Sequence, residues 1–117
     1  MSQINFEALV RQHPEYSRAL RKLDSWMRSQ IDLRFINPRS LAKEVTGVDK
    51  AELAGALTAL QQAGYLRRVY KVLTPSGVIA DGEFEDPTQI PERLPDRFEN
   101  YFDTAEADIL PIFRMVA

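Results

Sequence analysis

The sequence predicts an α+β fold with helices in the first half of the chain and strands in the second. Apolar residues recur at helical spacing between Pro14 and Gly64, and from Tyr65 onward they alternate with polar residues as in a strand. Glycine and proline mark the points where the pattern changes. The length of 117 residues suits one domain. We therefore expect a single domain, 1–117, made of N-terminal helices (1–35), a central core (36–80) and an acidic loop with a closing strand (81–117).

The composition limits the class of protein. With 44% hydrophobic and 27% charged residues, the chain has the balance of a folded protein. Because it has no cysteine, it can form no disulfide, thiolate nucleophile or cysteine-ligated metal site. The sequence shows no leader pattern at its start and no apolar run of roughly 20 residues. We expect a cytoplasmic protein without a cofactor or a membrane partner.

The net charge of -2 is divided unevenly along the chain. Residues 1–73 carry 12 Lys and Arg against 7 Asp and Glu, whereas residues 74–117 carry 3 against 10. A pI near 5.4 is not the basic signature of a nucleic-acid-binding protein. Two differing solvated surfaces are the favoured interpretation. The alternative is that the acidic half covers or mimics something basic.

Two helices are predicted in residues 1–35. The first covers Phe6 to Arg11, and the second covers residues 14–30, where Pro14 suits the first turn and His13 lies in the cap region. Apolar side chains at helical spacing make the second helix amphipathic: Tyr16, Ala19, Leu20, Leu23, Trp26 and Met27.

Two further helices are predicted in the central core. Asn37 can accept a hydrogen bond from first-turn amides and Pro38 presets the backbone, so a helix should start there and stop at Gly47. Asp49 should cap the next helix, which ends at Gly64. The inner stripe of that helix consists of Leu53, Leu57 and Leu60.

Strand patterns follow Gly64. Tyr65 to Thr74 alternates, Pro75-Ser76-Gly77 has turn chemistry, and Val78 and Ile79 resume the pattern, which predicts a β-hairpin. Residues 86–108 are rich in proline and acidic residues and are predicted to be mostly loop, with room for one turn of helix. Residues 109–116 are predicted to form a closing strand, which Pro111 would restrict to an edge or a bulge.

The order of signals over residues 36–80 is that of a known domain. A capped helix, a glycine-containing turn, a second helix, the exit Ala63-Gly64-Tyr65-Leu66 and a strand pair follow one another. This stretch resembles a winged helix-turn-helix domain. The resemblance implies that two helices cross at a tight turn, pack on the preceding helix and are flanked by a hairpin wing.

A second resemblance lies in the C-terminal part. Thr74-Pro75-Ser76-Gly77 and Leu94-Pro95-Asp96-Arg97 resemble the Cys-Pro-x-Cys knuckles of a zinc ribbon in which every cysteine is replaced. The resemblance implies a degenerate ribbon-like tail. Chance placement of two proline turns is the alternative, since the chain has seven prolines. We expect no metal in either case, because the replacing side chains cannot rebuild a tetrahedral site.

Catalytic groups are scarce in the sequence. His13 is the only histidine and has no evident partner as a general base. The carboxylates Asp81, Glu83, Glu85 and Asp86 have no glycine-rich phosphate loop beside them, so an exposed acidic wing is favoured over a Mg²⁺ site. We expect a protein that is not an enzyme.

Two kinds of binding remain open. A DNA-binding winged helix would present long cationic side chains from the helix over residues 49–63. The outer positions of that helix, however, are small or acidic. DNA contact would then rely on cationic side chains that bind the phosphate backbone of the DNA. These are Arg39, Lys43, Lys50, Arg67, Arg68 and Lys71.

Small residues on the same helix face favour a protein partner, because they permit close approach. The alternative is that these positions have no partner, and that Gly55 is a neutral accident. Aromatic rings in the tail are further contact candidates unless they fill the core, as Phe113 also could. The predicted interface residues are Ala51, Ala54, Gly55, Thr58, Phe98, Tyr101 and Phe102. The favoured function is a winged-helix protein-interaction module, either an adaptor subunit of a bacterial-type assembly such as a defence system or a homodimer, and the alternative is a DNA-binding transcriptional regulator.

Overall fold

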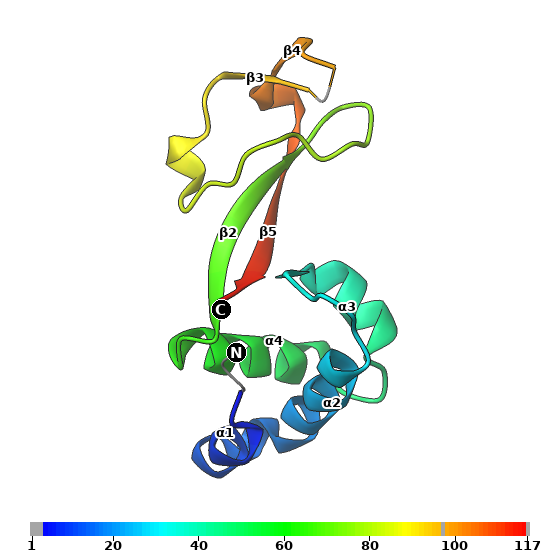
Figure 1. Ribbon diagram of the computed structural model, residues 1–117, viewed down its shortest axis with the longest axis vertical. Coiled ribbons are helices and arrows are strands. Elements are labelled where there is room, and N and C mark those ends of the chain that lie inside the picture. The colour runs from blue at the N-terminus through cyan, green and yellow to red at the C-terminus, as the bar shows by residue number, and fades with distance from the viewer. Residues whose placement is uncertain (1–3, 97, 117) are drawn as a thin grey trace. The chain divides into compact units, whose positions relative to one another are not determined.

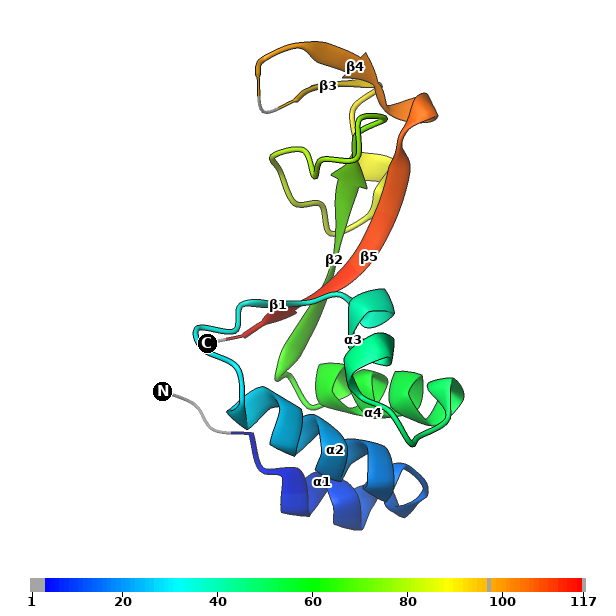
Figure 2. The same ribbon diagram turned by 90° about the vertical axis from the view of Figure 1, so that its right-hand side faces the viewer.

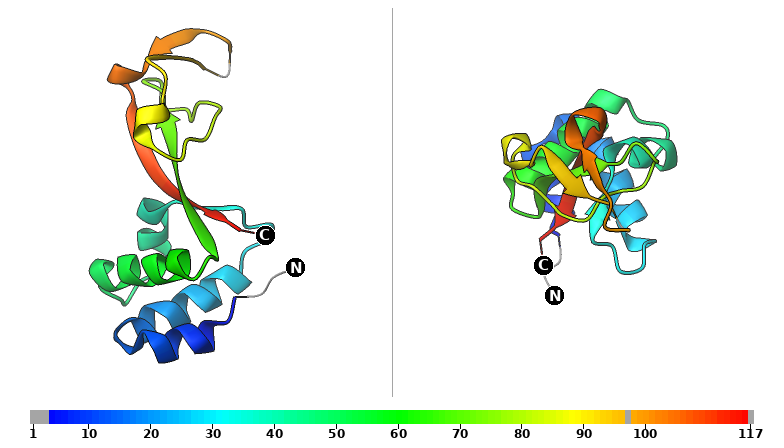
Figure 3. Two further views of the ribbon diagram at one scale, coloured as in Figure 1. Left: turned by 90° about the vertical axis from the view of Figure 1, so that its left-hand side faces the viewer. Right: turned by 90° about the horizontal axis from the view of Figure 1, so that it is seen from above.

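The helices of the first half are present in the computed structural model, which describes residues 4–96 and 98–116 (Figure 1). The predicted helix over residues 14–30 is divided, because its first turn is a 3-10 helix. α1 lies side by side with α2 (Figures 2 and 3). The helical elements are α1 (Phe6–Gln12), η1 (Pro14–Tyr16), α2 (Ser17–Arg28), α3 (Pro38–Glu44) and α4 (Lys50–Gln62).

The strands form two antiparallel sheets, which makes the fold α+β as predicted. One sheet has the strand order β1-β5-β2, and the other pairs β3 with β4. Two short 3-10 helices, η2 (Pro87–Gln89) and η3 (Thr104–Glu106), lie between strands. The strands are β1 (Phe35–Ile36), β2 (Leu66–Leu73), β3 (Arg93–Pro95), β4 (Tyr101–Asp103) and β5 (Asp108–Met115).

The chain divides into two compact units, which are described separately below. The first unit consists of Met1–Arg67 with Phe113–Ala117, and the second consists of Arg68–Ile112. The division falls inside β2 and β5. It does not coincide with the expected subdivisions at 35/36 and 80/81, and the single-domain organisation stays a prediction.

The predicted caps of α3 and α4 are confirmed. Asn37 Oδ1 accepts a hydrogen bond from the Arg39 amide at 3.0 Å, and Asp49 Oδ1 accepts one from the Ala51 amide at 3.3 Å. At the other end of α4, Gly64 has φ +87°, and the Tyr65 amide reaches back to the Leu60 carbonyl at 3.0 Å. This left-handed closure satisfies a terminal carbonyl, as helix ends require.

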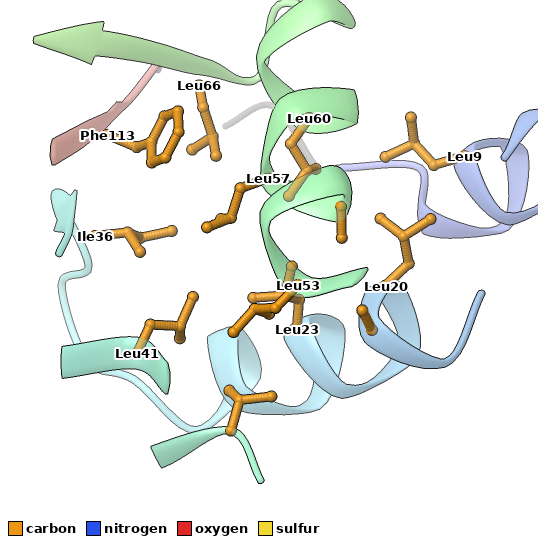
Figure 4. Close-up of a cluster of buried hydrophobic side chains, with 13 residues drawn as sticks. Leu9, Leu20, Leu23, Ile36, Leu41, Leu53, Leu57, Leu60, Leu66 and Phe113 are labelled. Atoms are coloured by element: carbon orange, nitrogen blue, oxygen red, sulfur yellow. The ribbon is translucent and has the colours of Figure 1, made fainter. Parts of the chain in front are cut away.

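The leucines of α4 face the core of the first unit, as predicted (Figure 4). Leu57 is 2% exposed and Leu60 is fully buried. Phe113, named above as a contact candidate, also lies in this core and is 8% exposed. It is therefore a packing residue. Partners of the α4 leucines include Leu9, Leu20, Leu23, Ile36, Leu41 and Leu66.

The predicted hairpin after Gly64 is only partly formed. The chain turns after β2, with isolated bridges between Leu73 and Ile79 and between Tyr70 and Phe84. Residues 78–85, which follow the turn, form no regular strand, and the sheet neighbour of β2 is β5 from the end of the chain. The return segment is interrupted as a strand because its apolar run, Val78 to Ala80, is followed by Gly82, whose φ of +108° is disfavoured in strands.

The closing strand is confirmed as β5, but it is not an edge strand, because it lies between β1 and β2. Pro111 is tolerated there for a local reason. The register of β1 on β5 covers only Phe113 and Arg114, so Pro111 lies outside that pairing. A proline costs no hydrogen bond where its nitrogen faces no partner strand.

Candidate interaction surfaces

The outer face of α4 carries three of the predicted interface residues. Ala51, Ala54 and Thr58 are exposed, and their spacing places them on one side of the helix. The Thr58 hydroxyl donates to the Ala54 carbonyl at 3.0 Å, so its polar group is already bonded within the helix. The face is therefore small and nearly apolar, and its backbone can be approached closely.

Gly55 does not belong to this open face. A Cβ atom at this position would lie 2.3 Å from Cε1 of the Tyr16 ring, which is too close for two non-bonded carbon atoms. The glycine lets η1 pack directly on α4. The Tyr16 ring therefore explains why this residue is glycine. Neither an external partner nor a neutral substitution is needed to explain it.

The cations proposed for DNA contact lie on three elements. Arg39 and Lys43 are exposed on α3, Lys50 is exposed at the start of α4, and Arg67 is exposed on β2 within the first unit. In the second unit, Arg68 is exposed and lies over the Tyr70 ring at 5.7 Å, and Lys71 is half-buried.

The two units have opposite net charge. Among residues 1–67 and 113–117 there are 11 Lys and Arg against 7 Asp and Glu, a balance of +4. Residues 68–112 carry 4 against 10, a balance of -6. The asymmetry seen in the sequence therefore follows the structural division.

The β3–β4 hairpin presents two of the three predicted aromatic contacts. Phe98 is 74% exposed and Tyr101 is 64% exposed. The turn between the strands is held by Asp96, whose Oδ1 accepts hydrogen bonds from the amides of Phe98 at 2.8 Å and Asn100 at 3.0 Å. The Arg93 guanidinium lies 5.8 Å from the centre of the Tyr101 ring. The Phe98 amide is thus held by the Asp96 carboxylate, and Tyr101 begins β4.

Phe102 has a different role from its neighbour Tyr101. It is half-buried and packs against the small core formed by Val72, Ala80 and Leu94. Alternation along β4 turns the Phe102 ring toward this core while Tyr101 points outward, and the contact role of Phe102 stays a prediction. The hairpin itself was not predicted, since its strands of three residues each show too little alternation to be recognised.

A groove between α2 and the end of α3 was also missed. It has a volume of about 510 Å³ and lies wholly within the first unit. The half-buried Trp26 donates its ring N–H to Glu44 Oε2 at 3.1 Å, and the Lys22 ammonium donates to the Thr46 carbonyl. The groove is lined by Arg21, Lys22, Ser25, Trp26, Glu44, Val45 and Thr46.

Lys22 and Arg18 also hold the turn that follows α3. Arg18 Nη1 donates to the Gly47 carbonyl at 3.5 Å, next to the Lys22 contact with Thr46. Gly47 has φ +83°, and a Cβ there would lie 2.5 Å from the Lys22 nitrogen. The left-handed backbone conformation therefore favours glycine here, whereas the Lys22 ammonium lies at the end of a flexible side chain and could move aside.

The remaining polar candidates have local partners. His13 stacks on Tyr16 with ring centres 6.1 Å apart, and its Nδ1 lies 3.7 Å from Glu15 Oε1. Thr74 Oγ1 lies 2.9 Å from the Ser76 hydroxyl and accepts a hydrogen bond from the Val78 amide at 3.2 Å. Of the second ribbon-like knuckle, Leu94 is buried and Arg97 lies outside the described residues. The ribbon resemblance stays a prediction.

Among the acidic candidates, Asp86 begins η2. Its Oδ1 accepts hydrogen bonds from the Thr88 amide and from the Thr88 hydroxyl, each at 2.9 Å. Both bonds lower the pKa of Asp86 below its ordinary value, and the bond from the backbone amide has the larger effect. Within the part of the chain that the structure describes, no three His, Cys, Asp or Glu side chains are grouped to hold a metal ion.

This cap makes a prediction about pH. Because the pKa of Asp86 is lower in the folded state, its cap stabilises the fold above the unfolded pKa, and this contribution is lost as pH falls through the folded pKa. Thr88→Val removes the hydroxyl bond and keeps the amide bond, so the Asp86 pKa should rise part of the way toward its ordinary value. An NMR titration of the carboxyl carbon measures this shift. Thr58→Val, which removes a hydroxyl bonded elsewhere, should leave the Asp86 titration unchanged.

Comparison with known proteins does not place the chain in a family, since no protein-family model, curated protein or solved structure matches it. The described helices include none that is long and apolar enough to cross a membrane.

Proposed function

We propose that this chain is a non-catalytic winged-helix protein-interaction module, acting as an adaptor subunit of a larger assembly or as a homodimer. The observation that carries the proposal is the pair of exposed rings, Phe98 and Tyr101, on the hydrogen-bonded β3–β4 hairpin. Aromatic side chains supply much of the binding energy at protein interfaces. Rings whose backbone is already held by hydrogen bonds lose less conformational freedom when they bind, which favours association.

The helix-turn-helix part of the proposal rests on the first unit. α3 and α4 are joined by a short turn that contains the left-handed Gly47, and α4 contacts both α2 and α3. Two helices that cross at a tight glycine turn against a preceding helix are the arrangement of a helix-turn-helix motif. β2 and the turn after it occupy the position of a wing in the chain order.

The alternative function is DNA binding, and the exposed cations Arg39, Lys43 and Lys50 favour it. Specific reading of DNA needs hydrogen-bonding side chains from the recognition helix that reach base edges. The outer face of α4 presents Ala51, Ala54 and Thr58, and the Thr58 hydroxyl is bonded within the helix. This face suits close protein contact better than base contact.

Ala54→Arg distinguishes the two functions. In a DNA-binding protein, one added phosphate contact should strengthen binding at low salt and steepen the salt dependence by about one unit. In an interaction module that uses this face, the arginine opposes close approach and must be desolvated, so association through α4 should weaken by several kcal/mol. Fluorescence anisotropy with duplex DNA at several salt concentrations and analytical ultracentrifugation measure the two effects.

Gln12→Arg is the matched control, because it adds the same charge at an exposed position on α1. We expect wild-type binding to DNA to be no tighter than non-specific, with Kd about 10⁻⁴–10⁻⁶ M at physiological salt. Ala54→Arg and Gln12→Arg should then change that binding equally. Clearly tighter wild-type binding that Ala54→Arg strengthens more than Gln12→Arg would show that the protein is a DNA-binding regulator instead.

A further inference from the structure

The exposed hairpin and the α2–α3 groove have complementary chemistry. Residues 92–108, which contain the hairpin, carry six Asp and Glu against two Arg. The groove carries Arg21 and Lys22 against the single carboxylate of Glu44, and Arg18 lies one turn away on α2. An acidic, aromatic surface and a cationic groove with an aromatic wall therefore occur in the same chain, one in each unit.

The lining of the groove suits an aromatic side chain. The half-buried Trp26 packs against the core from one side and lines the groove with the rest of its surface. Arg21 is exposed beside it, and its side chain makes no ion pair or hydrogen bond with the described residues. A ring that enters this groove can stack on Trp26, and the Arg21 guanidinium can lie over the face of the entering ring. Both contacts are favourable.

We infer that the occupant of the groove is the β3–β4 hairpin of a second copy of this chain, with Tyr101 or Phe98 placed against Trp26. The carboxylates around the hairpin then face Arg18, Arg21 and Lys22, so opposite charges meet across the junction. Each copy offers one hairpin and one groove, so every junction joins the hairpin of one copy to the groove of another. This inference rests on the proposed function and names its partner.

A junction of this kind is sensitive to salt. The screening length falls from roughly 10 Å at 0.1 M to roughly 3 Å at 1 M, so exposed charge pairs lose most of their attraction over this range. We therefore expect the weight-average mass of the wild type to rise with concentration above that of the 13.4 kDa monomer at low salt. The mass should fall toward the monomer as salt is added. Sedimentation equilibrium measures both trends.

A pair of variants tests the junction between hairpin and groove. The groove variant combines Arg21→Glu with Trp26→Phe and keeps its hairpin, whereas the hairpin variant combines Phe98→Ser with Tyr101→Thr and keeps its groove. Each variant alone should stay monomeric, since one half of the junction is missing. Their mixture should form a dimer through the one intact hairpin and the one intact groove.

The sole tryptophan makes the mixture a site-specific assay. Because the groove variant has no tryptophan, all tryptophan emission comes from the intact groove of the hairpin variant. Titration with the groove variant should change that emission with saturation, and added salt should reverse the change. Arg11→Glu makes the same charge reversal at an exposed position outside the groove, and it should leave wild-type association unchanged.

Three results would overturn the inference. They are a wild type that stays monomeric at low salt, a variant that still associates alone, and a mixture that stays monomeric although the wild type associates. Loss of association with Ala54→Arg but not with either junction variant would place the contact on α4, which rejects the inference and keeps the proposed function. Circular dichroism and thermal unfolding confirm that each variant is folded. The DNA titration bears only on the proposed function.

Discussion

Replacement of Leu57 by alanine is expected to lower the free energy of unfolding by about 2–5 kcal/mol, the range for emptying a packed leucine site. Leu57 is 2% exposed and lies in the core of the first unit, where α4 packs on α2 and α3 (Figure 4). The loss includes the transfer free energy of the side chain and the cavity that remains. Urea denaturation followed by circular dichroism measures it.

Thr58→Ala is the matched control for this substitution, since Thr58 is the exposed neighbour of Leu57 on the same helix. A surface change of this kind should alter stability by no more than about 0.5 kcal/mol. If Leu57→Ala cost well under about 1 kcal/mol, the buried face of α4 would be wrongly assigned.

The helices could be predicted because their signals are local. Asn37, Asp49 and Gly64 act through hydrogen bonds or backbone angles within a few residues, so the sequence around each is sufficient. The leucine stripe of α4 repeats at helical spacing for the same reason. These features depend on no distant segment.

The strand pairing and the candidate surfaces depend on distant segments. β2 pairs with β5, and only tertiary packing brings the end of the chain beside residues 66–73. Phe102 and Tyr101 are adjacent aromatic residues with opposite environments, which composition cannot separate. The groove beside Trp26 exists because the end of α3 packs near α2, and in the sequence that tryptophan is one more member of an apolar stripe.

Gly55 illustrates the same limit most clearly. In the sequence it is a glycine inside a helix, where glycine is less stable than alanine by about 1 kcal/mol. A binding partner outside the chain would be one way to explain that cost. The explanation is Tyr16, 39 residues earlier, whose ring occupies the space of the missing side chain. A contact over that separation is invisible to any local pattern.

Gly55→Ala is therefore expected to destabilise the fold although alanine is the better helix former. The added methyl would lie 2.3 Å from the Tyr16 ring, which is held between α4 and His13. Overpacking of this kind costs about 1–3 kcal/mol, and the gain in helix propensity is at most about 1 kcal/mol, so we expect a net loss of up to about 2 kcal/mol. Chemical denaturation of the wild type and the variant measures the difference.

The sign of the effect should reverse when the ring is removed. In a Tyr16→Ala background the space beside Gly55 is open, so Gly55→Ala should stabilise the protein by up to about 1 kcal/mol through helix propensity alone. The double-mutant cycle then yields a coupling energy between the two sites of about 1–3 kcal/mol. Ala54→Gly, at the exposed neighbouring position, should destabilise by about 1 kcal/mol in both backgrounds, because no ring is involved there. If Gly55→Ala stabilised the wild type and the Tyr16→Ala protein equally, the ring would not be what excludes a side chain from this position, and α4 would be free to accept one.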